Sequence, residues 1–237
     1  MSGAAIDPRP VVAVSGLVLE ARIASGPGVR TIAGGGDGHR LGVALEREFA
    51  RGATAIISFG IAGGLTAAAR PGTWFVAEAV VTRTARWQVD AAWAAALAAL
   101  LPGAVSGDLA GADGIIAAPA DKHALGHATG AIAVDTESHV VAAFAAARGI
   151  PFAVFRVIAD PVARALAPAA TRGMRQDGAV DHRAVLGSVV REPGQLPTLM
   201  RNALDTRTAL RALSRGRRLL GPGLGYPDLR QLLVDVS

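Results

Sequence analysis

Four carboxylates lie where buried elements of the chain are expected to end: Glu20, Asp135, Glu137 and Asp160. A carboxylate beside apolar segments loses hydration, so its presence there needs a reason. Such groups act as a general base on water, bind a sugar diol or, when protonated, act as a general acid. We therefore treat these acids as the candidate chemistry of the chain. For each acid alone, a helix cap or a surface charge is the simpler alternative.

Residues 134–161 hold three of these acids around one helix and one strand. Asp135 falls where a strand turns into an apolar helix, a position that suits a helix cap. Asp160 closes the apolar run at residues 152–158, and we expect burial to raise its pKa. Glu137 and Asp160 fit a cap less well. In an open α/β sheet, acids at strand ends indicate a site at the carboxyl edge.

Apolar runs and helical spacing alternate along the first 160 residues or so. Strands are predicted at residues 11–14, 29–33, 53–59, 74–82, 131–134 and 152–158, and further short ones at 104–109 and 114–118. Helices are predicted at residues 17–23, 40–51, 91–101 and 119–127. The alternation predicts an α/β fold of three layers, with a mixed central sheet flanked by helices on both faces.

The pattern changes after Asp160. Residues 161–197 are rich in Pro, Arg and Gly, with one apolar helix predicted at 183–190. Residues 196–220 predict one long helix or two, and we expect residues 196–237 to form a helical C-terminal extension. Residues 1–10 are expected to form a tail. Because no internal repeat or long linker interrupts the chain, we expect one domain over residues 1–237.

Two glycine-rich stretches follow predicted strands, at residues 34–38 and 60–64. Glycine lets the backbone approach a ligand and aim N–H groups at an anion. Neither stretch is a dinucleotide motif. In the first, Gly34 and Gly36 match the start of G-x-G-x-x-G, but His39 stands where its last glycine belongs. Tight turns are the alternative for either stretch alone. Together with the acids, the two stretches favour a ligand crevice.

The composition narrows the class of protein. Of 237 residues 51% are apolar, enough for a large core, and there is no cysteine to form a disulfide or a thiolate site. The net charge is +5, and Lys122 is the only lysine. No signal peptide and no run of about 20 apolar residues is visible, so we expect a cytoplasmic protein.

Arginines at 207, 211, 215 and 218 fall on one face of the predicted long helix. A solvated face is the simpler interpretation, and peripheral contact with anionic lipids, at the inner membrane, is the alternative. Nucleic-acid binding is not expected, because the charge is local and aromatic residues are few. His123 and His127 have the spacing of two metal ligands, but without a third we expect no metal.

Four ordered blocks resemble the nucleoside phosphorylase and nucleosidase superfamily, particularly methylthioadenosine/adenosylhomocysteine nucleosidase. They are SGLVLEA at residues 15–21, GIAGG at 60–64, DTES at 135–138 and PFAVFRVIAD at 151–160. The C-terminal part resembles the hopanoid-associated phosphorylase branch. That resemblance implies the release of adenine from adenosylhopane, a nucleoside with a large apolar 5′ group, in hopanoid biosynthesis. It also implies a homodimer or higher homo-oligomer and no cofactor.

The resemblance assigns roles to individual residues. Asp160 would protonate or hydrogen-bond N7 of the departing adenine, Glu137 would bind the ribose hydroxyls, and Glu20 would orient or activate water. Further substrate-binding positions would be Gly16, Gly60, Ile61, Gly63, Gly114, Ile115, Thr136 and Phe152. Anionic side chains suit this chemistry because bond cleavage builds positive charge on the ribose.

Three departures from the family pattern affect the expected site. Thr136 replaces a methionine that packs against the sugar, Ala159 replaces a serine beside the catalytic aspartate, and Ile61 replaces a hydroxyl residue near the nucleophile. A methylthioadenosine-type nucleosidase is the competing enzyme, and the changes at Thr136 and Ala159 motivate a second alternative, an inactive nucleoside-binding protein.

The sequence leaves two candidates for the nucleophile, water and inorganic phosphate. Phosphorylases of the superfamily hold phosphate with arginines at the places where this chain has Glu20 and Ser58. Arg22 and Arg40 are near in sequence and could substitute. Glu20 and Ser58 at these places favour water as the nucleophile, whereas the name of the branch favours inorganic phosphate as co-substrate. On balance phosphorolysis is slightly favoured.

Overall fold

The computed structural model describes residues 10–173, 175 and 177–227. Most of the expected tail at residues 1–10 and the last ten residues of the expected C-terminal extension lie outside the described residues. No helix in the described ranges is both long enough and apolar enough to cross a membrane.

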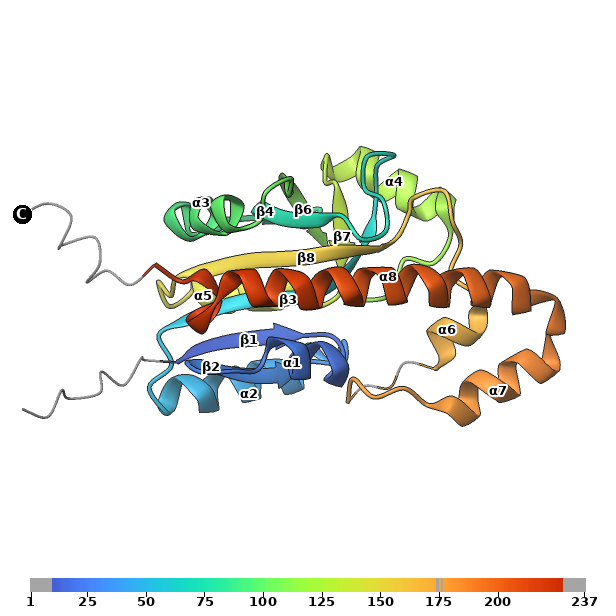
Figure 1. The fold of residues 1–237 in the computed structure, drawn as a ribbon, viewed down its shortest axis with the longest axis horizontal. Coiled ribbons are helices and arrows are strands. Elements are labelled where there is room, and N and C mark those ends of the chain that lie inside the picture. Colours follow the sequence, from blue (N-terminus) through green and yellow to red (C-terminus); the bar gives the residue numbers. More distant parts are fainter. Residues whose placement is uncertain (1–9, 174, 176, 228–237) are drawn as a thin grey trace, which may run out of the picture.

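A mixed sheet forms the centre of the fold (Figure 1). Over the described residues it has eight strands: β1 Val11–Ser15, β2 Val29–Ala33, β3 Ala55–Gly64, β4 Trp74–Val81, β5 Arg86–Gln88, β6 Val105–Gly111, β7 Ala133–Asp135 and β8 Phe152–Asp160. Strands β1, β3 and β8 run parallel, whereas β4 is antiparallel to β8 and β7 is antiparallel to β3. Because β6 joins β4 to β7, the pairings close a ring through β3, β8, β4, β6 and β7.

Helices cover both faces of this sheet, as the sequence predicts. They are α1 Val18–Ala24, α2 Gly38–Ala50, α3 Ala91–Leu100, α4 Pro119–Thr129, α5 Ser138–Ala146, α6 Pro168–Arg172, α7 His182–Arg191 and α8 Leu196–Leu220, with short 3-10 turns at Pro193–Gln195 and Pro222–Gly225. Buried side chains of α1, α3 and α8 form one core with the sheet, and those of α2 and α5 form a second core on its other face. The three-layer α/β prediction is confirmed.

Strand β3 corrects one prediction. Residues 60–64, expected to form a glycine-rich turn, instead continue the strand, because Gly60 pairs with Arg156 of β8 and Gly63 pairs with Val134 of β7. The glycines allow this because side chains from neighbouring elements occupy the space that a Cβ would need. The strand predicted at residues 114–118 is also wrong, since this segment forms no strand.

Helix α8 is one continuous helix of 25 residues. It lies across the sheet beside β8 in Figure 1. Gly216 allows close packing, since a Cβ there would lie 2.6 Å from the ring of Phe155. The indole Nε1 of Trp74 donates to the carbonyl of Ala212 at 2.9 Å. These contacts fix α8, so that its N-terminal half extends past the carboxyl edge of the sheet.

Candidate functional site

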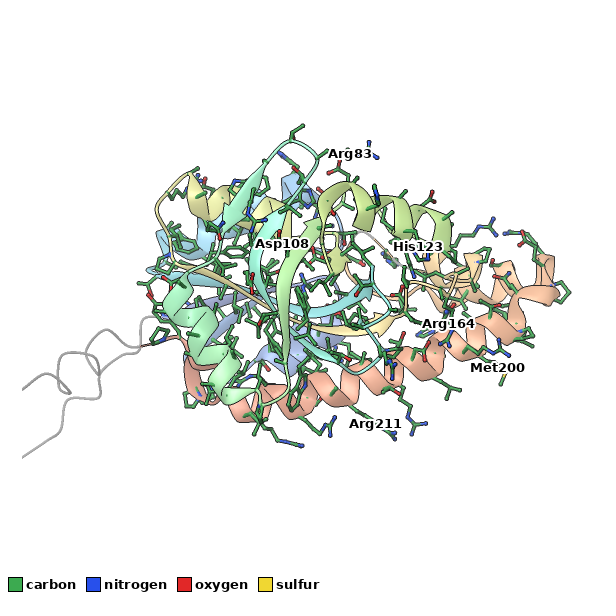
Figure 2. All side chains as sticks on the ribbon, turned by 90° about the horizontal axis from the view of Figure 1, so that it is seen from above. Arg83, Asp108, His123, Arg164, Met200 and Arg211 are labelled. Carbon is green, nitrogen blue, oxygen red and sulfur yellow. The ribbon has the colours of Figure 1, made fainter. Side chains whose placement is uncertain are left out.

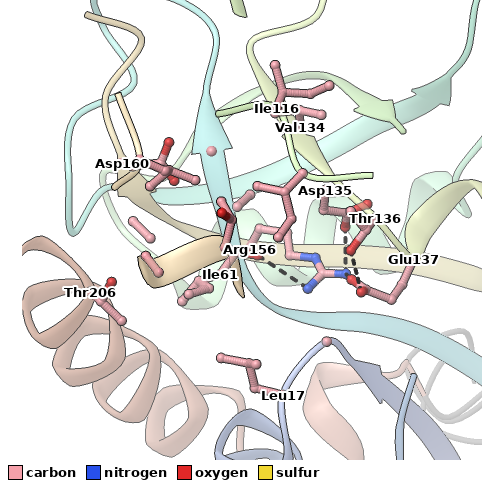
Figure 3. Close-up of a pocket in the computed structure, with 18 of the residues that line it drawn as sticks. Leu17, Ile61, Ile116, Val134, Asp135, Thr136, Glu137, Arg156, Asp160 and Thr206 are labelled. Carbon is pink, nitrogen blue, oxygen red and sulfur yellow. Dashed lines mark hydrogen bonds and ion pairs between the residues drawn. The ribbon is translucent and has the colours of Figure 1, made fainter. Parts of the chain in front are cut away.

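A pocket of about 240 Å³ lies at the carboxyl ends of the parallel strands β1, β3 and β8. Nine positions predicted from the sequence line it: Gly16, Glu20, Ile61, Gly63, Gly114, Ile115, Thr136, Glu137 and Asp160. The parallel strands explain this meeting, because their carboxyl ends point to the same edge of the sheet. Figure 3 shows Asp160 and Glu137 on opposite sides of this pocket.

Two predicted binding residues do not line the pocket. Phe152 begins β8 whereas Asp160 ends it, so the two lie about 26 Å apart along the strand. Phe152 is buried in the core, and its assignment to substrate binding is wrong. Gly60 lies behind the pocket, where a Cβ would come within 2.7 Å of Glu20 Oε2. Gly60 therefore makes room for the acid rather than for a ligand.

Arg156 is one of two buried cations at the site. Its side chain is fully buried on β8, and Nη2 lies 2.5 Å from Asp135 Oδ2 and 3.6 Å from Glu137 Oε2 (Figure 3). Nη2 also donates to Ser58 Oγ at 2.6 Å. A buried guanidinium needs such partners because desolvation of an unpaired charge is costly. Arg156 thus holds two acids at one wall of the pocket.

Glu137 is the acid that the resemblance assigns to the ribose hydroxyls. Thr136 Oγ1 donates to its Oε1 at 2.5 Å, and a Cβ on Gly16 would lie 3.1 Å from the same oxygen. Burial raises the pKa of Glu137 to about 7; Arg156 opposes that rise, and the negative charge of Asp135 adds to it. Thr136, one of the three departures from the family pattern, therefore orients a carboxyl whose pKa burial raises to about 7.

Glu20 lies on α1 and is buried against β3. Its Oε2 accepts from the backbone N–H of Leu17 at 2.9 Å, and its Oε1 accepts from the N–H of Ile61 at 3.0 Å. Burial raises the pKa of Glu20, while the charge of Arg156 and these backbone hydrogen bonds act in the opposite direction. A carboxylate with a raised pKa is a better acceptor for a proton from water.

Asp160 stands on the other side of the pocket beside a buried lysine. Lys122, fully buried on α4, forms an ion pair with Asp160 Oδ2 and donates to the carbonyls of Pro161 and Arg164 at 3.3 and 2.9 Å. Burial raises the pKa of Asp160, as expected, and Lys122 opposes the rise. Because Ala159 has no hydroxyl, Lys122 is the side chain that holds this carboxyl.

Asp135 binds the start of α5, as the sequence indicated for a cap, although Glu137 and not Asp135 is the N-cap residue of that helix. Its Oδ1 accepts from the backbone N–H of Ser138 at 3.0 Å, at the start of α5, and its Oδ2 accepts from Ser138 Oγ at 2.5 Å. The same carboxylate is also the ion-pair partner of Arg156. Asp135 therefore fixes both the helix and the cation of the site.

The C-terminal part also lines the pocket, which sequence reasoning missed. Leu166, Ala170, Asn202 and Thr206 lie on its wall, the last two from α8. Asn202 is buried, accepts from the N–H of Ala167 at 2.9 Å and donates to a carbonyl at 3.2 Å. Thus α8 and the segment before α6 close the pocket together.

Two sequence signals pointed to residues that sequence reasoning left without a role. Lys122 is the one lysine in an arginine-rich chain, and Arg156 is a charge inside an otherwise apolar strand. Both turn out to be buried partners of site acids. No group of three or more His, Cys, Asp or Glu side chains in the described ranges is placed to hold a metal ion. The site in those ranges therefore consists of carboxyls, two buried cations and apolar walls.

A family model described as the phosphorylase superfamily matches residues 28–191, well over half of the chain. This chain belongs to the phosphorylase superfamily. The predicted superfamily is thereby confirmed. The match does not reach Gly16 and Glu20, which the fold brings to the pocket. A search of curated proteins gives no match.

Solved structures share the fold of this superfamily member. An S-adenosylhomocysteine nucleosidase from Streptococcus pyogenes, in complex with 5-methylthiotubericidin, aligns with a TM-score of 0.63 at 16% identity, over 93% of this chain and all of the other. A Helicobacter pylori nucleosidase mutant with 5′-methylthioadenosine in its active site aligns with a TM-score of 0.59 at 13% identity, over 88% and 97%. A putative Borrelia burgdorferi nucleosidase bound to adenine gives 0.60 at 12% identity, over 88% and 99%.

Proposed function

We propose that this protein cleaves the N-ribosidic bond of an adenine nucleoside and releases adenine. The observation that carries the proposal is one pocket lined by Asp160, Glu137 and Glu20, with Asp160 and Glu137 on opposite sides of it (Figure 3). Similar folds bind 5′-methylthioadenosine and adenine in the Helicobacter and Borrelia proteins, which supports an adenine nucleoside as the substrate. The phosphorylase superfamily supports the reaction type.

Asp160 is the proposed acid for the leaving base. When the bond from N9 to C1′ breaks, its electron pair goes to adenine, and the Asp160 carboxyl gives its proton to N7. Burial raises the pKa of this carboxyl, which increases its protonated fraction. The apolar walls near Ile116 and Val134 leave space for a flat base beside Asp160 (Figure 3).

The opposite side of the pocket suits the sugar and the nucleophile. Glu137 accepts hydrogen bonds from the ribose hydroxyls, and negative charge there stabilises the cationic ribose of the transition state. Glu20 takes a proton from the attacking water as oxygen bonds to C1′. Its raised pKa matches it to this role.

The charges around the pocket favour water over phosphate, against the slight preference drawn from the sequence. Four carboxyls line the pocket with one guanidinium, that of Arg156, which is already bound to Asp135. Arg22 and Arg40, the candidate substitutes for phosphate ligands, are not among the residues that line it. A phosphate would meet like charge there, so we propose hydrolysis and keep phosphorolysis as the outcome that the experiment separates from it.

An apolar groove beside the pocket supports a large apolar 5′ group, and adenosylhopane is our candidate substrate. The groove runs between α1 and α8, and its apolar lining includes Leu19, Ile23, Leu199 and Leu210. It shares Ala170, Asn202 and Thr206 with the pocket, so the two lie side by side. A small methylthio group would leave this groove empty, whereas a polycyclic hydrocarbon would bury its surface there.

A methylthioadenosine-type nucleosidase is the second candidate. The fold it shares with nucleosidases from several bacteria favours this alternative. It predicts efficient cleavage of methylthioadenosine and no gain from an apolar 5′ group. An inactive nucleoside-binding protein would bind but release no adenine.

The remaining parts of the proposal concern the setting of the enzyme. We propose that residues 1–237 act as one domain, that no cofactor is needed, and that the protein works in the cytoplasm as a homo-oligomer with peripheral contact to the inner membrane. Its role would be in hopanoid biosynthesis.

The experiment measures free adenine from adenosylhopane and from methylthioadenosine, each with and without inorganic phosphate. We expect faster release from adenosylhopane, no dependence on phosphate, and free sugar as the second product. Faster release from methylthioadenosine would favour the second candidate, and a sugar phosphate product would establish phosphorolysis. No adenine from either substrate would contradict both enzyme functions.

A further inference from the structure

Helix α8 carries one continuous stripe on its outer face. The stripe consists of Leu196, Met200 and Leu204 followed by Arg207, Arg211, Arg215 and Arg218. Successive members are three or four residues apart, so all seven lie on one side of the helix. Figure 2 shows Met200 and Arg211 on the side of α8 that faces away from the sheet. The face is therefore available at the surface of the chain.

The first half of the stripe exposes apolar side chains. Met200 and Leu204 are 60% and 62% exposed, and Leu196 is 45% exposed. On the adjoining helix α7, Leu186 and Val190 are also largely exposed. Single exposed apolar residues are common, but three on one face of a helix indicate an interaction surface.

The second half of the stripe is purely basic. Arg207, Arg211, Arg215 and Arg218 are exposed, and no salt bridge joins any of them to a carboxylate within the described ranges. Arg215 lies over the ring of Trp74 at 5.7 Å. Negative charge on a partner would complement this half of the stripe.

We propose that this stripe, Leu196 to Arg218, docks the protein on an anionic lipid membrane. An amphipathic helix binds such a surface by burying apolar side chains at the headgroup boundary while its basic side chains meet the headgroups. A second copy of the chain fits less well, because a two-fold contact through this face would bring the same arginines from both copies together. Charge complementarity thus selects lipid over a second copy.

Docking through this stripe would also place the groove at the membrane. The four arginines also line the groove between α1 and α8, which lies beside the pocket and shares three lining residues with it. Docked through α8, the enzyme holds the groove beside the bilayer, where a substrate with an apolar 5′ group is dissolved. This consequence rests on the proposed function, whereas the docking itself does not.

The test is sedimentation with vesicles of phosphatidylcholine alone and of phosphatidylcholine with 30% phosphatidylglycerol. We expect binding to the anionic vesicles only, and weaker binding as salt is raised. Replacing Arg207, Arg211 and Arg218 by Gln removes three charges and spares the arginine over Trp74. Each arginine near an anionic surface contributes about a fivefold factor in affinity, so the triple variant should bind roughly 100-fold more weakly.

A matched control replaces three exposed arginines on other surfaces, Arg47, Arg51 and Arg83, by Gln and should bind as the wild type does. Met200→Ser with Leu204→Ser should also weaken binding, at unchanged charge. Adenine release from water-soluble methylthioadenosine is measured for every variant, because it reports the proposed function separately from docking. Wild-type protein that ignores anionic vesicles, or a triple variant that binds them normally, would overturn the proposal. So would dimers that dissociate in the triple variant without any vesicle binding.

Discussion

At the level of single residues, two buried cations hold the acids of the site in place. Arg156 contacts Asp135 and Glu137 on the proposed sugar side, and Lys122 contacts Asp160 on the proposed base side. Arg156 opposes the rise in pKa that burial causes in Glu137, and Lys122 opposes the rise in Asp160. The pKa values of these two carboxyls therefore stay closer to the working pH than burial alone would leave them.

Lys122 is a positioning residue whose effect should be visible in the pH dependence of kcat/KM. Lys122→Met removes the charge that lowers the pKa of Asp160, so the protonated form of Asp160 should persist to higher pH. We expect the basic limb of the profile to move upwards, with a loss of roughly 3 kcal/mol in the free energy of unfolding from the broken buried pair.

The control for this variant is Lys122→Arg, which keeps the cation beside Asp160. It should leave the basic limb near its wild-type position, even where the larger side chain lowers kcat. If the limb stays in place in Lys122→Met while only stability falls, then Lys122 has a purely structural role.

At the level of elements, β3 connects the two sides of the site, because it continues as a strand where a turn was expected. Its continuation through Gly60–Gly64 pairs with both β8 and β7, so it joins the two sides of the site. It also supplies the N–H of Ile61 that holds Glu20. Helix α8 contributes in a similar way, because its N-terminal half brings Asn202 and Thr206 over the pocket.

The fit of β3 behind the site can be tested at Gly60. In Gly60→Ala the added methyl would meet Arg156 Nη1 at 2.6 Å and Glu20 Oε2 at 2.7 Å. We expect a loss of about 1–3 kcal/mol in unfolding free energy, measured with urea, together with reduced kcat, because both side chains must shift.

Gly42→Ala provides the matched comparison for Gly60→Ala. Gly42 lies in α2, and a Cβ there has nothing within 4 Å. The same change should therefore stabilise the protein by about 0.5–1 kcal/mol and leave kcat unchanged. Equal effects of the two substitutions would show that the space behind the site is unimportant.

At the level of the whole molecule, the buried acids make stability depend on pH. The folded pKa of Glu137, about 7, lies above the ordinary value of 4.5. The folded state therefore binds a proton more tightly, and its contribution to stability is complete below about pH 4.5 and is lost as pH rises through 7. Wild-type unfolding free energy should fall across this window, by up to roughly 3 kcal/mol from Glu137.

Glu137→Gln removes this titration, so the decline in unfolding free energy between pH 5 and 8 should become shallower. Glu20 and Asp160, whose pKa values are also raised, leave a residual slope in the same direction. Urea unfolding at each pH measures it. An unchanged slope in the variant would mean that Glu137 does not titrate in this range.

Much of the fold and half of the site chemistry follow from local sequence patterns. Apolar runs predict most strands and helices, and parallel strands bring Glu20 and Asp160 to one edge. The partners of these acids do not follow, because they are distant in sequence: 38 residues separate Lys122 from Asp160. Phe152 fails for another reason: the resemblance carried it over with Asp160, although the strand predicted at residues 152–158 already placed the two at opposite ends. The contribution of α8 depends on packing that no local pattern encodes.

The most direct measurement compares adenine release by the wild type and by Asp160→Asn, with adenosylhopane as substrate. The asparagine keeps the shape of the side chain but has no carboxyl proton to give to N7. We predict that kcat falls by roughly 100- to 10,000-fold while the circular dichroism spectrum stays unchanged. Full activity in the folded variant would contradict the account.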